Sequence, residues 1–84
     1  MYSTSLSKQA EKFIKKAEKE LAKRLIQKIE KLETEPIPTD AKTIEGSNKT
    51  FRIRLGKYRI LYTINHNQKE ILIAKIDNRE NVYD

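Results

Sequence analysis

Residues 51–62 read FRIRLGKYRILY, and this stretch decides how the rest of the chain is organised. Apolar and basic residues alternate over its first half, which predicts a strand with Phe51, Ile53 and Leu55 on one face. The Gly-Lys pair that follows is a turn signal, and residues 58–62 predict a second strand rich in aromatic and β-branched residues. We therefore expect two neighbouring strands here, with one apolar face between them.

The same two strands bring basic side chains together. Arg52 and Arg54 fall on the face opposite the apolar one, Lys57 lies in the turn, and Arg59 lies in the second strand. No acidic residue occurs over residues 46–69, so we expect this cluster to be uncompensated. A sheet face with that much positive charge should attract a polyanion.

Composition narrows the class of protein. The chain has 84 residues, 37% of them hydrophobic, so we expect one domain over residues 1–84 with a thin core and no deep substrate pocket. It has no cysteine, which excludes disulfides and thiolate chemistry. It has no apolar run long enough to span a membrane, so we expect a soluble, cytoplasmic protein with no membrane partner. The net charge is +6.

The region before these strands has a helical pattern. Residues 2–6 could form a short strand, and Ser7 is a good N-cap for a helix that begins near Lys8. Apolar residues then recur every three or four positions up to Leu32, which marks one helical stripe. The stripe is weakest around residues 18–20, so we expect a break there and a helical hairpin.

The rest of the chain completes a sheet. Pro36 and Pro38 end the helical region, and residues 39–47 are predicted to be a connection. Residues 71–76 are nearly continuously apolar, which is typical of a central strand covered on both faces, and residues 77–84 are predicted to be a polar tail. The predicted fold is therefore α+β, with an N-terminal helical hairpin packed on one face of a small, mainly antiparallel sheet.

This succession of elements resembles the RelE/ParE toxin superfamily over nearly the whole chain. The likeness rests on a helical hairpin, a connection with two prolines, residues 51–62, an apolar strand, and the sequence NRENVY at residues 78–83. RelE-type members are ribosome-dependent endoribonucleases that cut mRNA and are silenced by a small antitoxin. ParE-type members have a similar fold and poison DNA gyrase.

The resemblance also assigns a site. Arginine clusters suit RNA cleavage, because each planar guanidinium can bind two oxygens of the phosphorane that forms during attack by the 2′-hydroxyl. By its chemistry Arg79 is the candidate for stabilising the leaving oxygen, and Tyr83 could stack on a base or mediate proton transfer. The residues assigned in this way as catalytic are Arg52, Arg54, Arg59, Arg79 and Tyr83, and we add Lys49 and Lys57, which flank the first strand, as RNA-binding residues.

The sequence departs in two ways from the pattern of the best-studied relatives. Arginine stands at positions 52 and 54, where those relatives have lysine, and Asp77-Asn78 stands where many have Gly-His. Arginine stays charged and does not exchange protons, so we expect these residues to stabilise charge. No metal or other cofactor is expected.

The expected partners are a RelB-like antitoxin, in a heteromeric toxin–antitoxin complex, together with the ribosome and mRNA. Two alternatives stay open, a ParE-like inhibitor of DNA gyrase and a weakly active relative. Without the family likeness, an Arg-x-Arg pair on a strand is more often a solvated surface. Tyr58 and Tyr62 share one face of their strand and are more readily explained as packing residues than as RNA contacts.

Overall fold

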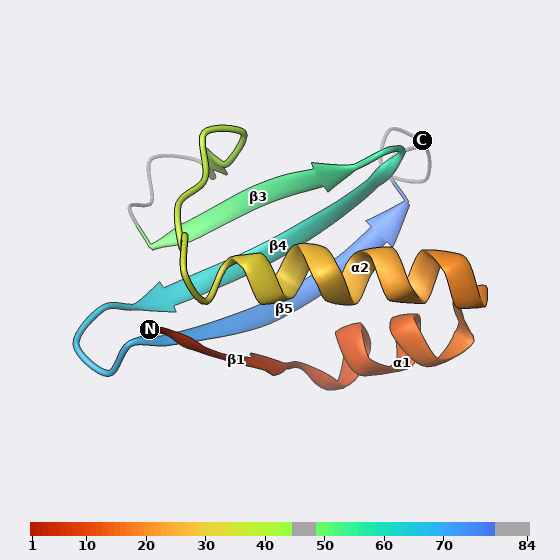
Figure 1. The fold of residues 1–84 in the computed structure, drawn as a ribbon, viewed down its shortest axis with the longest axis horizontal. Helices are drawn as coiled ribbons and strands as arrows, with labels where there is room; N and C mark the ends of the chain where they lie inside the picture. Colours follow the sequence, from red (N-terminus) through yellow and green to blue (C-terminus); the bar gives the residue numbers. More distant parts are fainter. Residues whose placement is uncertain (45–48, 79–84) are drawn as a thin grey trace.

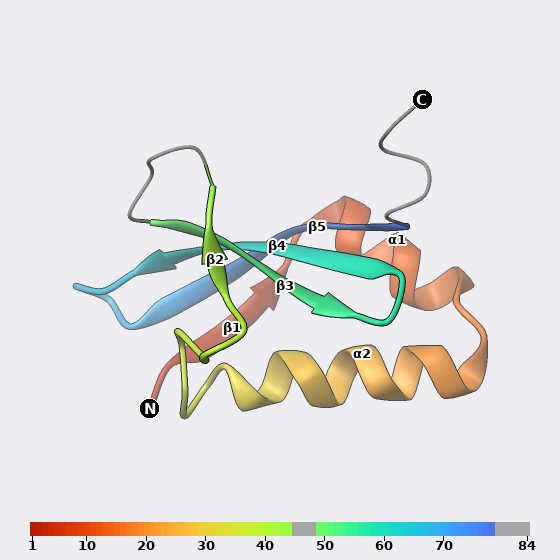
Figure 2. The ribbon, with the colours of Figure 1, turned by 90° about the horizontal axis from the view of Figure 1, so that it is seen from above.

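The computed structural model describes residues 1–44 and 49–78, which form one five-stranded sheet and two helices. The elements are β1 (Ser3–Leu6), α1 (Lys8–Lys16), α2 (Lys19–Lys31), β2 (Lys42–Thr43), β3 (Thr50–Leu55), β4 (Tyr58–Asn65) and β5 (Glu70–Asn78). The strands lie in the order β1-β5-β4-β3-β2; β1 runs parallel to β5, and all other pairs are antiparallel. Figure 1 shows α2 lying across the sheet, and Figure 2 shows the same layers from above. The α+β fold predicted from the sequence is confirmed.

The helical hairpin forms where the sequence predicts it. Ser7 caps α1 by accepting a hydrogen bond from the backbone N–H of Ala10 at 3.1 Å, and its hydroxyl donates to the carbonyl of Ala74 in β5 at 2.7 Å. Ala17 and Glu18 both have extended backbone angles and separate the two helices. The cap therefore does two things: it starts α1 and ties it to the sheet.

The core lies between the helices and one face of the sheet, as the alternation in residues 51–55 predicts. Phe51 and Ile53 are buried in β3, and neighbouring strands present buried residues to the same side. Tyr62 is fully buried, and its hydroxyl donates to the carbonyl of Pro36 at 2.8 Å. Packing is thus the role of Tyr62. The buried core comprises Ala10, Leu25, Ile29, Leu32, Phe51, Ile53, Ile60, Tyr62, Ile64, Ile71, Ile73 and Ile76.

Two predictions about the sheet are wrong. Residues 42 and 43, expected to lie in a connection, form β2 beside β3. Strand β5 is covered on one face only, since Leu72 is 43% exposed and Lys75 is exposed. A β-bulge explains how so apolar a strand can expose one face to solvent. Leu61 pairs with Lys75 but Tyr62 pairs with Ile73, so β5 has one extra residue at this point. The extra residue shifts the alternation, and Ile76 therefore still faces the core.

Strand β5 also extends to Asn78, through residues expected to lie in a tail. Neither helix of the described residues is both long and apolar enough to cross a membrane.

Candidate functional site

The sheet face that turns away from the helices carries most of the basic residues of the strands. Strand register places Lys42 opposite Arg52, Arg54 opposite Arg59, and Arg59 opposite Asp77. These pairs all project from the side that does not carry the core residues. We call this surface the basic face; it consists of Lys42, Arg52, Arg54, Arg59, Lys75 and Asp77.

Arg52 and Arg54 form the open centre of the basic face. Their neighbours in β3, Phe51 and Ile53, point into the core, which forces both arginines to the other side. Arg54 is exposed and Arg52 is half-buried, and among the described residues no carboxylate forms an ion pair with either of them. Both guanidinium groups can therefore receive an anion, and their assignment as catalytic residues stays a prediction.

Lys42 is a member of the basic face that the sequence alone did not indicate. Its strand, β2, has two residues and no recognisable alternation, so nothing in the pattern placed it beside β3. In the structure Lys42 is exposed and lies directly opposite Arg52. Side chains in such cross-strand pairs have Cβ atoms about 4.5–5.5 Å apart. One oxyanion can thus be reached by a lysine and an arginine from two strands.

Arg59 differs from the other arginines, because it has a carboxylate partner. Its Nε and one terminal nitrogen donate to the two oxygens of Asp77 at 3.2 and 3.3 Å, and the side chains are only 15% and 17% exposed. Lys75 Nζ lies 3.8 Å from the same carboxylate. The expectation of an uncompensated cluster is therefore wrong for Arg59. Residues 46–69 contain no acidic residue, but Asp77, which neutralises Arg59, lies on the adjacent strand β5.

The two lysines assigned to RNA binding do not lie together. They flank opposite ends of β3, a six-residue strand, which separates them by about 20 Å. Lys57 is exposed in the turn at the Arg54 end, with Nζ 5.8 Å from the centre of the Tyr58 ring, and Gly56 beside it has a φ of +60° that suits glycine. Lys49 is exposed at the far end, beside the β4–β5 hairpin.

Arg79 and Tyr83 lie outside the described residues, so their assignment stays a prediction. The last described residue, Asn78, pairs with Tyr58 at the start of β4. Arg79 is the next residue in the chain, directly after the strand that contributes Asp77.

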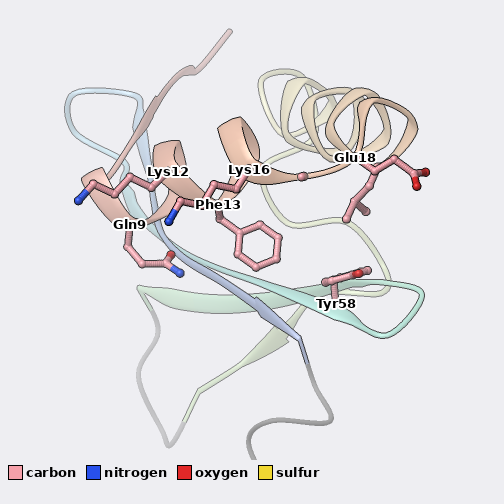
Figure 3. Close-up of a pocket in the computed structure, with 8 residues that line it drawn as sticks. Gln9, Lys12, Phe13, Lys16, Glu18 and Tyr58 are labelled. Carbon is pink, nitrogen blue, oxygen red and sulfur yellow. The ribbon is translucent and has the colours of Figure 1, made fainter.

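A groove of about 560 Å³ lies on the other side of the sheet. Phe13 and Leu21 from the two helices and Tyr58 from β4 line it, and Lys12, Lys16 and Glu18 stand around them. Figure 3 shows Phe13 directed from α1 toward Tyr58, and the two ring centres are 5.9 Å apart in an edge-to-face arrangement. Tyr58 is thus a packing residue that also lines this groove, and the groove is separate from the basic face.

Comparison with known proteins agrees with the fold. A family model described as the ParE toxin of type II toxin–antitoxin systems matches residues 5–83. The archaeal RelE–RelB complex from Pyrococcus horikoshii contains a chain with 32% identity and a TM-score of 0.83, covering 93% of this chain and 94% of that one. A second, the RelB–RelE antitoxin–toxin complex from Methanococcus jannaschii, has 26% identity and a TM-score of 0.72, with 94% of each chain covered.

A curated relative from Methanocaldococcus jannaschii, named "Putative toxin RelE1", is 41% identical over 58 residues. That match covers 66% of this chain and 64% of the relative, so it spans less than two thirds of the relative's length. The isolated Escherichia coli RelE toxin has the same fold, with a TM-score of 0.81 at 16% identity over 93% of this chain and 84% of that one. From the extent of the family match and the archaeal likeness, the chain belongs to the RelE/ParE superfamily of toxins from type II toxin–antitoxin systems.

Proposed function

We propose that this protein is the toxin of a toxin–antitoxin pair and that it cleaves mRNA on the ribosome, in the cytoplasm, as one domain over residues 1–84. The observation that carries the proposal is the basic face, where Arg52 and Arg54 have no acidic partner among the described residues. The 32% identity with an archaeal RelE chain favours the RelE type of activity over other activities of the superfamily.

Cleavage by the 2′-hydroxyl of RNA makes three demands. The hydroxyl must lose a proton, the negative charge of the phosphorane must be stabilised, and the leaving 5′-oxygen must be neutralised. Arg52 and Arg54 meet the second demand, since preorganised cations that face developing charge stabilise the transition state by about 3–4 kcal/mol each. Lys42 stands beside them and contributes a further contact to the RNA backbone.

Other residues complete the proposed site. Arg59 adds a guanidinium next to Arg54, and Arg79 stabilises the leaving oxygen. Tyr83 stacks on a base and holds the RNA splayed open. Lys49 and Lys57 bind the RNA backbone at the two ends of β3. The ribosome supplies positioning of the substrate, which can account for a large part of the acceleration when the enzyme offers no strong base.

The proposed partner is a RelB-like antitoxin. The two archaeal structures similar to this chain are complexes of RelE with RelB. A net charge of +6 and an open basic face favour an acidic partner that covers the arginines and keeps RNA away. Coexpression with the neighbouring reading frame should yield a stable complex, and isolation of the toxin alone would contradict this part of the proposal.

Induction of the toxin in growing cells tests the activity. We expect growth to stop, and primer extension to show mRNA ends within ribosome-bound codons. The matched control is Arg52→Ala/Arg54→Ala, which removes the two open guanidinium groups while leaving the core face of β3 intact. Intact transcripts in cells arrested by the toxin would refute mRNA cleavage.

A second candidate is inhibition of DNA gyrase. The matching family model is described as a ParE toxin, and ParE-type members of the superfamily poison this enzyme. In that case the arrested cells should accumulate DNA breaks, and purified toxin should inhibit supercoiling by gyrase in the absence of ribosomes. The same induction experiment therefore separates the two candidates.

A further inference from the structure

We propose that Asp77 is a positioning residue for Arg59: its carboxylate holds the guanidinium in one orientation and directs its end edge toward the scissile phosphate beside Arg54. The inference rests on the proposed cleavage of RNA. It adds a residue of negative charge to the proposed site.

The geometry of the ion pair supports this role. Arg59 donates through Nε at 3.2 Å and through one terminal nitrogen at 3.3 Å, each to a different oxygen of Asp77. A planar guanidinium held by this side edge cannot rotate without breaking both hydrogen bonds. The end edge, formed by the two terminal nitrogens, is a different edge of the same planar group. That edge has the bidentate geometry with which arginine binds two phosphate oxygens.

Burial makes the orientation firm. The side chains of Arg59 and Asp77 are 15% and 17% exposed, so water competes weakly for their hydrogen bonds. Arg54 stands directly opposite Arg59 on the neighbouring strand, and like charges in such a pair repel. The carboxylate on the other side of Arg59 offsets that repulsion, which allows two guanidinium groups to stay side by side before an anion arrives.

Asp77 is itself held on a rigid support. The residue before it, Ile76, is fully buried, and the side-chain amide of Gln9 in α1 bonds to both of its backbone polar groups. Gln9 Nε2 donates to the Ile76 carbonyl at 2.8 Å, and the Ile76 N–H donates to Gln9 Oε1 at 2.9 Å. Strand β1 pairs with β5 only as far as Ile73, and beyond that point Gln9 of α1 supplies hydrogen bonds to the same edge of β5. A carboxylate on so constrained a strand can orient its partner.

A competing role for Asp77 is that of general base for the 2′-hydroxyl. The two roles differ in one consequence. A positioning residue acts only through Arg59, so removing Asp77 has no further effect once Arg59 is absent. A base acts on the substrate, so its removal slows cleavage with or without Arg59. A double-mutant cycle distinguishes these cases.

The experiment measures single-turnover cleavage of mRNA on programmed ribosomes by the purified chain and by Asp77→Asn, Arg59→Ala and the double variant. We expect Asp77→Asn to lower the rate by up to about 100-fold with little change in the concentration for half-saturation, as misplaced catalytic groups do. The double variant should match Arg59→Ala within about twofold. A double variant that is slower by about tenfold or more, or an Asp77→Asn variant with the wild-type rate, would overturn the proposal. Asp40→Asn, which removes an ion pair on another part of the surface, is the control.

A second readout needs no activity and separates failure of the pair from failure of the proposed function. In NMR spectra of the wild-type chain, the Nε–H proton of Arg59 should exchange with water more slowly than that of the exposed Arg54. Asp77→Asn should remove this protection while the core signals persist. Equal exchange of the two protons in the wild-type chain would overturn the inference. Absence of cleavage by a chain with a protected Arg59 would count against the proposed function alone.

Discussion

Adjacent residues of β3 should separate stability from activity, because Ile53 and Arg54 point to opposite faces of the sheet. Ile53 is fully buried, and Arg54 is exposed. Ile53→Ala removes three buried carbon atoms, which costs about 2–2.5 kcal/mol of transfer free energy at about 0.8 kcal/mol each. The cavity left behind raises the total to about 2–5 kcal/mol.

That loss is large for so small a chain. Domains have an unfolding free energy of about 0.05–0.15 kcal/mol per residue, so this one has about 4–12 kcal/mol to lose. With about 4–8 °C per kcal/mol in a domain of this size, Ile53→Ala should lower the melting temperature by about 8 °C or more. Arg54→Ala should change the free energy of unfolding by about 0.5 kcal/mol or less and slow cleavage by about 100- to 1000-fold.

Thermal melts followed by circular dichroism, together with the ribosome cleavage assay, measure both quantities on the same preparations. Arg54→Lys is the matched control, since it keeps the charge and loses the planar fork. If Arg54→Ala unfolds while Ile53→Ala melts like the wild type, the assignment of the two faces of β3 is reversed. If Arg54→Ala melts normally and cleaves at the wild-type rate, Arg54 is not part of the site.

Three further predictions concern other contacts. Lys42→Ala should weaken RNA binding by the loss of one phosphate contact, and a filter-binding titration should show a slope of log K against log salt that is shallower by about 0.7. An unchanged slope would show that Lys42 does not contact the RNA backbone. Tyr62→Phe should cost about 0.5–1.5 kcal/mol at neutral pH, because the carbonyl of Pro36 loses its partner. Burial raises the pKa of Tyr62 from 10.0 to about 12. The wild type should therefore lose stability as the pH rises from about 10 to about 12, because the unfolded chain releases the phenol proton first. In alkaline denaturation curves, Tyr62→Phe should lose less stability over the same range. The hydrogen bond from Lys28 holds the pKa of Asp40 below its usual value. The pair's contribution to the free energy of unfolding, less than about 1 kcal/mol, is therefore present at neutral pH and is lost as the pH falls through the lowered pKa. A difference in stability between the wild type and Asp40→Asn that persists in urea melts at acid pH would contradict this.

The sequence by itself determined the two helices, strands β3 and β4, and the faces that these strands bury. The alternation in residues 51–55 assigned Phe51 and Ile53 to the core and two arginines to the opposite face, and the structure agrees. Ser7 marked the start of α1, and the weak stripe near residue 18 marked its end. These signals are local: side-chain periodicity and capping depend on residues within a few positions of one another.

Only the tertiary structure decided which charges meet. Asp77 lies 18 positions from Arg59, and Lys42 lies 10 positions from Arg52, yet strand pairing makes each pair direct neighbours. Such contacts depend on the register of adjacent strands, and in β5 a single extra residue at the bulge changes the register and the exposed face together. Composition could count the positive charges of the chain, but it could not place the Asp77 carboxylate beside Arg59. That position follows from the return of the chain through β5. Hydrogen bonding between strands, and not proximity in sequence, sets the neighbours of a side chain on a sheet.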